Sequence, residues 1–183
     1  MNNKSSKVPQ LVVLSVVGTD RAGVVNDVSK VILECGGNIE ESRMTALGSE
    51  FAMLMLVSGN WATVSKLEKA LDKMAAGKPI TITIRKTDPR KSSEECMPYG
   101  VDVVCLDQPG IVFNLASFFA ARKIEIADLS TRRYSAAHTG SQMFAVQMSV
   151  SIPGSVSILQ LREEFLELCD QLNLDAIIEP VKA

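Results

Sequence analysis

The chain has 183 residues, enough for one large or two small domains with buried cores. Hydrophobic residues make up 46% of the sequence and charged residues 22%, as is usual for a soluble globular protein. A formal net charge of -2 provides no broad cationic surface for phosphate backbones, so we expect no direct nucleic-acid partner.

The first eight residues are polar, and we expect a disordered N-terminus rather than a secretory signal. No apolar run reaches the roughly 18 residues that a membrane-spanning helix needs. We therefore expect a soluble, cytoplasmic protein without a membrane partner.

A buried strand is predicted at residues 11–17 (LVVLSVV), followed by a short polar elbow. Apolar residues then recur at helical spacing from Val24 to Cys35. Gly36 or Gly37 is expected to end this helix in a left-handed conformation.

Two further strands are predicted at residues 38–46 and 51–58, joined by a turn. Ser65 and Glu68 match a capping box and predict the start of a second helix. Residues 80–85 (ITITIR) alternate strictly, as expected of an edge or half-buried strand.

The same order of elements recurs in the second half of the chain. Asp20 and Asp107 are 107 − 20 = 87 residues apart, and Gly23 and Gly110 are 110 − 23 = 87 apart. The offset grows further along, as if the second copy had a longer loop, and Ser157 is expected to open its second helix. Two copies of one unit explain this pattern better than one large domain.

The order β-α-β-β-α-β predicts an α+β protein of two ferredoxin-like domains in tandem, each an antiparallel sheet with two helices on one face. We expect domains at residues 9–85 and 99–183, joined by a polar linker at 86–98 that contains two prolines. Strands 11–17 and 51–57 are apolar at nearly every position. Their second face is therefore expected to pack against the other unit or another chain.

Three functions of the elbow are unsupported by the sequence. A phosphate loop would need a lysine at the helix start, and none is present. A nucleophile would need a nearby base, and the sole histidine, His138, lies in a loop of the second unit, so we expect no enzyme. RNA binding would need several aromatic residues on the central strands, where only Phe51 and Phe144 occur.

A small zwitterion suits the elbow better. A helix N-terminus exposes N–H groups that favour a carboxylate, and Gly23 or Gly110 lets a ligand approach the backbone. Asp20 or Asp107 could then contact an ammonium group. The alternative is that each aspartate caps its helix and each glycine only makes the turn.

Four cysteines are scattered without metal-ligand spacing, and we expect neither a metal nor another cofactor. Cys35, Cys105 and Cys169 lie in apolar patterns and are expected to be buried, whereas Cys96 lies in a polar stretch. Met53 and Met55 are expected in the core. Trp61 is expected at the edge of the core, with a partner contact as the alternative.

The doubled unit, with DRAGVV and DQPGIV at its two elbows, resembles tandem ACT domains over about residues 9–181. The segment 35–61 (CGGNIEESRMTALGSEFAMLMLVSGNW) resembles a narrower group, the glycine cleavage repressors. This resemblance implies an amino-acid-responsive repressor of glycine cleavage, with glycine as its signal. It would act by contact with a LysR-type transcription activator rather than by binding DNA, and would form homo-oligomers through its sheets.

The resemblance also implies ligand-binding residues. At the first elbow these are Asp20, Arg21, Ala22, Gly23 and Val24, with Asn38 and Ile39 as the facing wall. At the second they are Asp107, Gln108, Pro109, Gly110 and Ile111, faced by Glu125 and Ile126. We expect the first to be the better site, because Glu125 repels a carboxylate and Pro109 lacks an N–H group.

Two other functions remain open from the sequence. One is an ACT-type amino-acid-binding module that regulates an enzyme or a nitrogen-signalling partner. The other is an interaction protein that binds no ligand.

Overall fold

The computed structural model describes residues 9–89 and 96–181. The chain divides into two compact units, residues 1–91 and 92–183, and each is described by itself. The expected disordered N-terminus at 1–8 lies outside the described residues. Strands β4 and β5 extend into the two ends of the predicted linker 86–98, so the segment between the strands is shorter than expected. Residues 90–95 of this segment also lie outside the described part.

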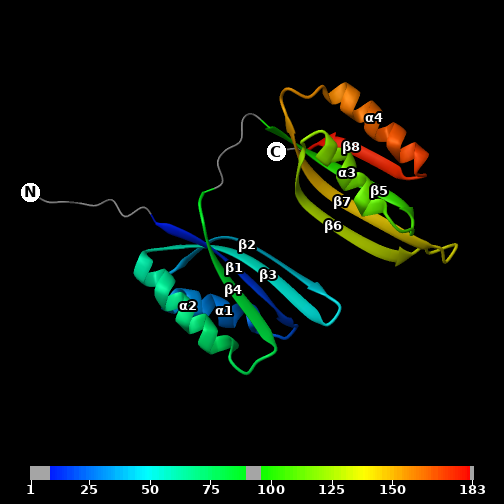
Figure 1. Ribbon diagram of the computed structural model, residues 1–183. Coiled ribbons are helices and arrows are strands. Elements are labelled where there is room, and N and C mark those ends of the chain that lie inside the picture. Colours follow the sequence, from blue (N-terminus) through cyan, green and yellow to red (C-terminus); the bar gives the residue numbers. More distant parts are fainter. Residues whose placement is uncertain (1–8, 90–95, 182–183) are drawn as a thin grey trace, which may run out of the picture. The chain divides into compact units, whose positions relative to one another are not determined.

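Each unit has the predicted β-α-β-β-α-β order (Figure 1). In the first unit the elements are β1 (Gln10–Thr19), α1 (Val24–Glu34), β2 (Asn38–Leu47), β3 (Glu50–Gly59), α2 (Trp61–Ala75) and β4 (Ile80–Thr87). In the second they are β5 (Cys96–Leu106), α3 (Ile111–Ala121), β6 (Glu125–Ser135), β7 (Gln142–Pro153), α4 (Ile158–Gln171) and β8 (Asp175–Pro180).

Both sheets are antiparallel and have the same strand order, β2-β3-β1-β4 in the first unit and β6-β7-β5-β8 in the second. The predicted fold class is thus confirmed. Strand β4 lies at an edge, as its alternating sequence predicted.

One face of each sheet packs against its two helices and forms the core. In the first unit the central strands bury every second side chain on this face, including Val12, Leu14, Met53 and Met55. The two methionines are therefore core residues, as predicted. In the second unit Phe118, Phe119 and Phe165 pack with ring centroids 5.3 to 5.4 Å apart.

The growing offset between the copies comes from the β6–β7 loop. The β-bulges at Ile39/Glu41 and Ile126/Asp128 still differ by 87 positions. Phe51 pairs with Gly18, and Phe144 pairs with Cys105, so β3 and β7 differ by 144 − 51 = 93 positions. The second unit therefore has six extra residues in this hairpin, four in the loop 136–141, where His138 lies, and one at the adjoining end of each strand.

Helix α2 begins earlier than predicted. Its N-cap is Asn60, whose side chain accepts a hydrogen bond of 2.9 Å from the backbone N–H of Thr63. Ser65 and Glu68 lie inside the helix, so the predicted capping box is wrong. The predicted place of Trp61 at the core edge is also wrong, because Trp61 is the first residue of α2 and is 65% exposed.

Candidate functional site

The first elbow, residues 20–23, connects β1 to α1 and is held by two neighbouring turns. The backbone N–H of Thr19 donates to Pro79 O at 3.2 Å, and that of Asp20 donates to Ser49 O at 2.9 Å. Gly18 must be a glycine, because a Cβ there would lie 2.5 Å from Pro79 O. The elbow is therefore fixed by both the β2–β3 and the α2–β4 connections.

Gly23, not Asp20, is the N-cap of α1. Its φ of 87° is left-handed, a conformation that glycine adopts without steric cost. No side chain caps the helix, so the proposed capping role of Asp20 is wrong, while the turn-forming role of Gly23 is confirmed. The first backbone N–H groups of α1 can therefore donate hydrogen bonds to water or to a ligand.

Arg21 is engaged within the elbow. Its Nη2 lies 2.5 Å from Asp27 Oδ2, and its Nη1 donates to Ala22 O at 3.2 Å. The hydrogen bond from Arg21 is the main reason why the pKa of Asp27 is lowered. Much of the positive charge of Arg21 is thus neutralised before any ligand arrives.

Asp20, by contrast, has no side-chain hydrogen bond or ion pair within residues 9–89 and 96–181. A small pocket of about 160 Å³ lies beside it, lined by Thr19, Arg21, Val24, Lys78, Pro79 and Ile80. Sequence reasoning missed Lys78 and Pro79, because only the folded sheet brings the start of β4 next to the end of β1.

The second elbow has the same backbone but a different charge pattern. Gly110 is the N-cap of α3 with a φ of 90°, again without a side-chain cap, so the alternative capping role of Asp107 is also wrong. Arg133 Nε lies 3.0 Å from Asp107 Oδ2. The position that corresponds to Arg133 is 133 − 87 = 46, which is Ala46 in the first unit. Of the two elbow acids, Asp107 alone is paired with a strand arginine.

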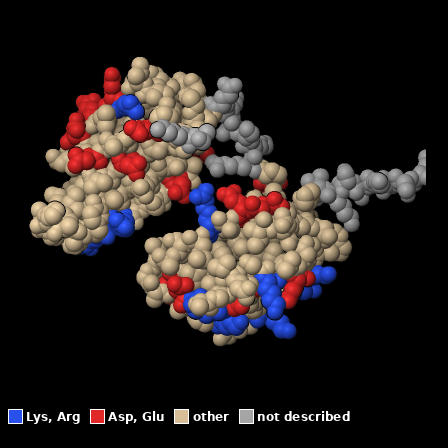
Figure 2. All heavy atoms as spheres, turned by 180° about the vertical axis from the view of Figure 1, so that it is seen from behind, with Lys and Arg blue, Asp and Glu red and all other residues tan. Residues whose placement is uncertain are grey.

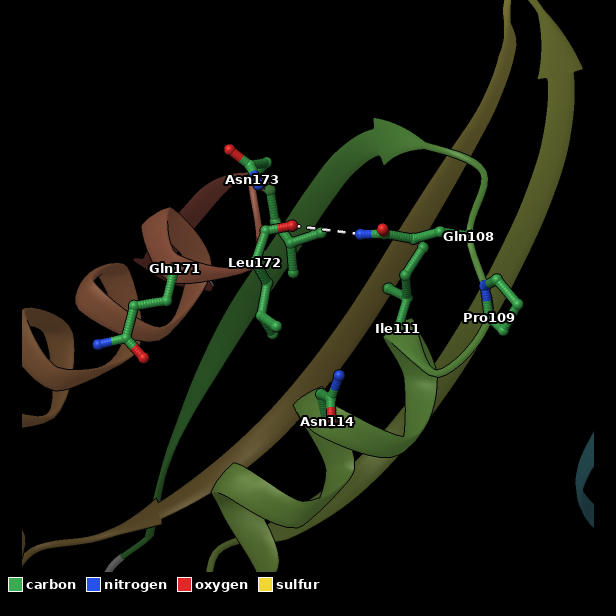
Figure 3. A pocket seen from close by; sticks show the side chains of 8 residues that line it. Gln108, Pro109, Ile111, Asn114, Gln171, Leu172 and Asn173 are labelled. Carbon is green, nitrogen blue, oxygen red and sulfur yellow. Dashed lines mark hydrogen bonds between the residues drawn. The ribbon is translucent and has the colours of Figure 1, made fainter.

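A polar cavity of about 200 Å³ lies beside the second elbow (Figure 3). Gln108 Nε2 points across it and donates to Leu172 O at 3.2 Å. Its lining residues are Gln108, Pro109, Ile111, Asn114, Gln171, Leu172, Asn173 and Leu174. The charged pair Arg21 and Asp27 of the first unit thus corresponds to the neutral amides Gln108 and Asn114 (21 + 87 and 27 + 87).

The residues that were expected to face each elbow do not lie beside the elbow of their own unit. Asn38 pairs with Ser58, and Ser58 pairs with Leu11, near the start of β1, whereas the elbow follows Thr19 at its end. Eight residues of strand separate these two ends by roughly 25 Å. Asn38 and Ile39 can therefore face Asp20 only if they belong to another unit. Glu125 and Ile126 lie likewise at the far end from Asp107.

Asn38 contacts its own strand. Its Nδ2 donates to Glu40 Oε1 at 3.0 Å, and Ser58 Oγ donates to the same oxygen at 2.5 Å. The Ser58 hydrogen bond is the largest cause of a lowered pKa of Glu40, followed by the one from Asn38. The amide of Asn38 keeps one N–H and its oxygen for another partner.

The cysteines form no disulfide, and Cys105 and Cys169 are buried as predicted. Cys35 is only partly buried, as is Cys96. Burial raises the pKa of Cys105, and it raises the pKa of Cys169 to about 11, so these thiols stay protonated. Within the described part of the chain, no three His, Cys, Asp or Glu side chains gather as a metal site would require.

Charged side chains of both signs share the surface. Figure 2 shows Asp and Glu among Lys and Arg in both units on the face in view. None of the helices in residues 9–89 and 96–181 has the length and apolar character needed to cross a membrane.

The chain is similar in sequence to a known domain family and to known proteins. Residues 10–85 match the ACT domain family. The glycine cleavage system transcriptional repressor of Escherichia coli is 30% identical over 169 residues, covering 92% of this chain and 89% of that protein. A UPF0237 protein of Methanocaldococcus jannaschii is 37% identical over 79 residues, which are 42% of this chain and 88% of that protein.

Two crystal structures resemble the whole chain. One, provisionally assigned as a glycine cleavage system transcriptional repressor, has a TM-score of 0.72 and 29% identity over 96% of this chain and 99% of its own. The other, a protein of unknown function from Galdieria sulphuraria, has a TM-score of 0.80 and 28% identity over 96% of this chain and all of its own.

Proposed function

Because the chain belongs to the ACT-domain family that includes the glycine cleavage system transcriptional repressor, we propose that it is an amino-acid-responsive repressor of glycine cleavage. It acts by contact with a LysR-type activator, binds no DNA itself and catalyses no reaction. The observation that carries this proposal is the similarity to the repressor across 92% of the chain, which includes both units.

The amino acid binds at the first elbow. The uncapped N–H groups that follow Gly23 suit its carboxylate, and the carboxylate of Asp20 suits its ammonium group. Glycine needs no room for a side chain, which agrees with the small pocket beside Thr19 and Val24. The second elbow is weaker, because Arg133 already neutralises Asp107 and Pro109 offers no N–H group.

Asn38 and Ile39 complete this site from another unit. They lie at the opposite end of the first sheet, so the first elbow by itself offers the ligand only one wall. A homo-oligomer formed through the sheets supplies the second wall, and ligand binding then couples to assembly.

One observation favours a second candidate, an ACT-type module that regulates an enzyme or a nitrogen-signalling partner. The UPF0237 relative matches only 42% of this chain yet 88% of its own length. Proteins of about half this length thus share a unit of this kind, so the unit itself is not tied to the two-unit repressor.

A thermal-shift screen of the twenty amino acids tests ligand binding. A ligand at about 100 times its dissociation constant stabilises the folded state by about 2.7 kcal/mol. We expect glycine, or another small amino acid, to raise the melting temperature. If no amino acid shifts it, sensing is excluded.

Co-purification tests the mode of action. The full chain is tagged and mixed with the LysR-type regulator of the same genome, with and without glycine. Retention that depends on glycine supports the repressor. Ligand binding without retention favours the second candidate.

A further inference from the structure

The polar cavity beside the second elbow offers hydrogen-bonding groups without charge. Its volume of about 200 Å³ far exceeds the roughly 10–15 Å³ that a single water molecule needs. Half of the eight residues that line it have a carboxamide side chain, and none of them has an ionisable one. The carboxamide residues are Gln108, Asn114, Gln171 and Asn173. The cavity thus provides amide donors and acceptors but no counter-ion.

Three segments hold these side chains around the cavity (Figure 3). Gln108 lies in the elbow, Asn114 on α3, and the other two at the end of α4 and in the turn that follows it. This turn is fixed, because the backbone N–H of Leu174 donates to Cys169 O at 2.9 Å. Leu174 and Ile111 are buried in the core and form an apolar base. The walls of the cavity are therefore in place before a ligand binds.

Most of these amide groups keep their capacity to form hydrogen bonds. Gln108 Nε2 donates to Leu172 O at 3.2 Å, which leaves Gln108 one N–H and its oxygen. Within residues 9–89 and 96–181, the side chains of the other three have no hydrogen-bond partner. Asn114 Nδ2 lies near the elbow, 3.8 Å from the position that a Cβ of Gly110 would occupy. A ligand held between Gln108 and Asn114 must therefore both donate and accept hydrogen bonds.

Acidic residues adjoin the cavity. Asp107, Asp170 and Asp175 each stand next to a lining residue in the sequence. Asp107 is paired with Arg133, whereas Asp170 and Asp175 have no ion pair with a described residue. A carboxylate in the cavity would lose hydration, find no cation in the lining and be repelled by these acids. The cavity therefore favours a carboxamide over a carboxylate.

The same place in the first unit is charged. Arg21 and Asp27, which correspond to Gln108 and Asn114, form an ion pair with Nη2 and Oδ2 2.5 Å apart. Lys78 also lines the pocket there. Of the two elbow cavities, the one in the second unit thus has the uncharged lining.

We propose that the cavity of the second unit binds a ligand that carries a primary carboxamide group. Such a group has the same donors and acceptor as an Asn or Gln side chain, so it pairs with one through two hydrogen bonds. Its carbonyl oxygen accepts from the amide N–H groups of Gln108 and Asn114, and its own N–H groups donate to the amide oxygens of the lining. Binding here requires neither glycine nor the first elbow.

Nuclear magnetic resonance of the full chain tests this with matched probes. Propionamide carries the carboxamide, and propionate is its carboxylate counterpart. We expect propionamide to shift the backbone N–H signals of residues 108–114 and 171–174, with a dissociation constant at least about tenfold lower than that of propionate. Acetylglutamine methylamide presents the same group as a protein side chain does. Tighter binding than propionamide assigns the carboxamide to a protein partner, and weaker binding assigns it to a free small molecule.

Substitutions locate the site. Asn114→Ala removes one amide of the lining and should weaken propionamide binding about tenfold or more. The matched control is Asn26→Ala, at an exposed position of α1, and it should change the dissociation constant less than about twofold. The double variant Gln108→Arg with Asn114→Asp copies the charged pair of the first unit and should abolish the preference for propionamide over propionate. Circular dichroism shows that each variant is folded.

Three results would overturn the proposal. The first is that propionamide at about 0.1 M leaves the signals of residues 108–114 and 171–174 unshifted. The second is that propionate binds as tightly as propionamide. The third is that Asn114→Ala binds propionamide like the wild type.

Discussion

Arg133 Nε lies 3.0 Å from Asp107 Oδ2, whereas Ala46 occupies the corresponding place beside Asp20. The two elbows therefore share a backbone and differ in the charge they offer a ligand. An ammonium group at Asp107 competes with a guanidinium that is already in place. At Asp20 no side chain of the described residues competes.

Asp20→Asn should weaken glycine binding by about tenfold or more, because a hydrogen bond to a charged group contributes about 1.5–3 kcal/mol. Asp107→Asn is the matched control and should stay within about twofold of wild type. Isothermal titration calorimetry of the full chain measures both. The reverse order, with Asp107→Asn more damaging, would place the ligand at the second elbow.

Gly18, near the end of β1, and Gly23, in the first elbow, should respond differently to alanine. At Gly18 the new Cβ meets the backbone, 2.5 Å from Pro79 O, and β4 must shift. At Gly23 the nearest atom is Arg21 Nη1 at 3.9 Å, and the cost comes from the φ of 87° alone. We expect Gly23→Ala to lower the free energy of unfolding by about 1 kcal/mol, and Gly18→Ala by about 2 kcal/mol or more. Urea unfolding measures the difference, and equal losses would contradict the contact at Pro79.

The fold could be predicted from the sequence because two signals repeat along the chain. The elbow motif and the apolar spacing recur at the same offset, so each copy supports the interpretation of the other. The helix start at Asn60 was missed because Ser65 and Glu68 also match a capping pattern, but inside the helix. The local sequence pattern cannot decide whether Asn60 or Ser65 begins the helix. The packing of Val64, Leu67 and Leu71 against the sheet decides it.

The site was less predictable than the fold. Gly23 and Asp20 were proposed as site residues from the elbow itself, a local feature. The place of Asn38 depends on strand register, which puts it at the far end of the sheet. The pairing of Arg133 with Asp107 joins residues 26 positions apart (133 − 107), and no sequence signal marks it.

Acid should weaken the second unit through Glu164. Arg122 donates two hydrogen bonds to Glu164 Oε2, at 3.0 Å from Nε and 2.6 Å from Nη2, and they hold the pKa of Glu164 below 4.5. Since the folded pKa is lower than the unfolded one, this stabilisation is present above pH 4.5 and is lost as the pH falls through the folded value. Urea unfolding between pH 7 and about pH 3 should show a shallower loss for Glu164→Gln than for wild type. Glu163→Gln, the neighbouring control, should follow the wild type.

The buried thiols should be protected from modification. The pKa of Cys169 is raised to about 11 and that of Cys105 is also raised, so little thiolate forms near pH 8. We expect a disulfide reagent to modify Cys35 and Cys96 in the native chain, and all four thiols only after unfolding. In Cys169→Ser the native count should be unchanged and the unfolded count lower by one. Rapid native reaction of Cys169 would show that α4 opens away from the sheet.

Trp61 is the first residue of α2 and is 65% exposed. Leu33, near the C-terminal end of the antiparallel helix α1, is a second exposed apolar residue, at 75%. Exposed tryptophans at interfaces often supply a large part of the binding energy. Under the proposed function, Trp61→Ala should weaken retention of the LysR-type regulator about tenfold while leaving the melting temperature and glycine binding unchanged. Leu159→Ala, at a 77% exposed position of α4, is the control and should affect none of these. If Trp61→Ala retains the regulator fully, the contact lies on another surface of the chain.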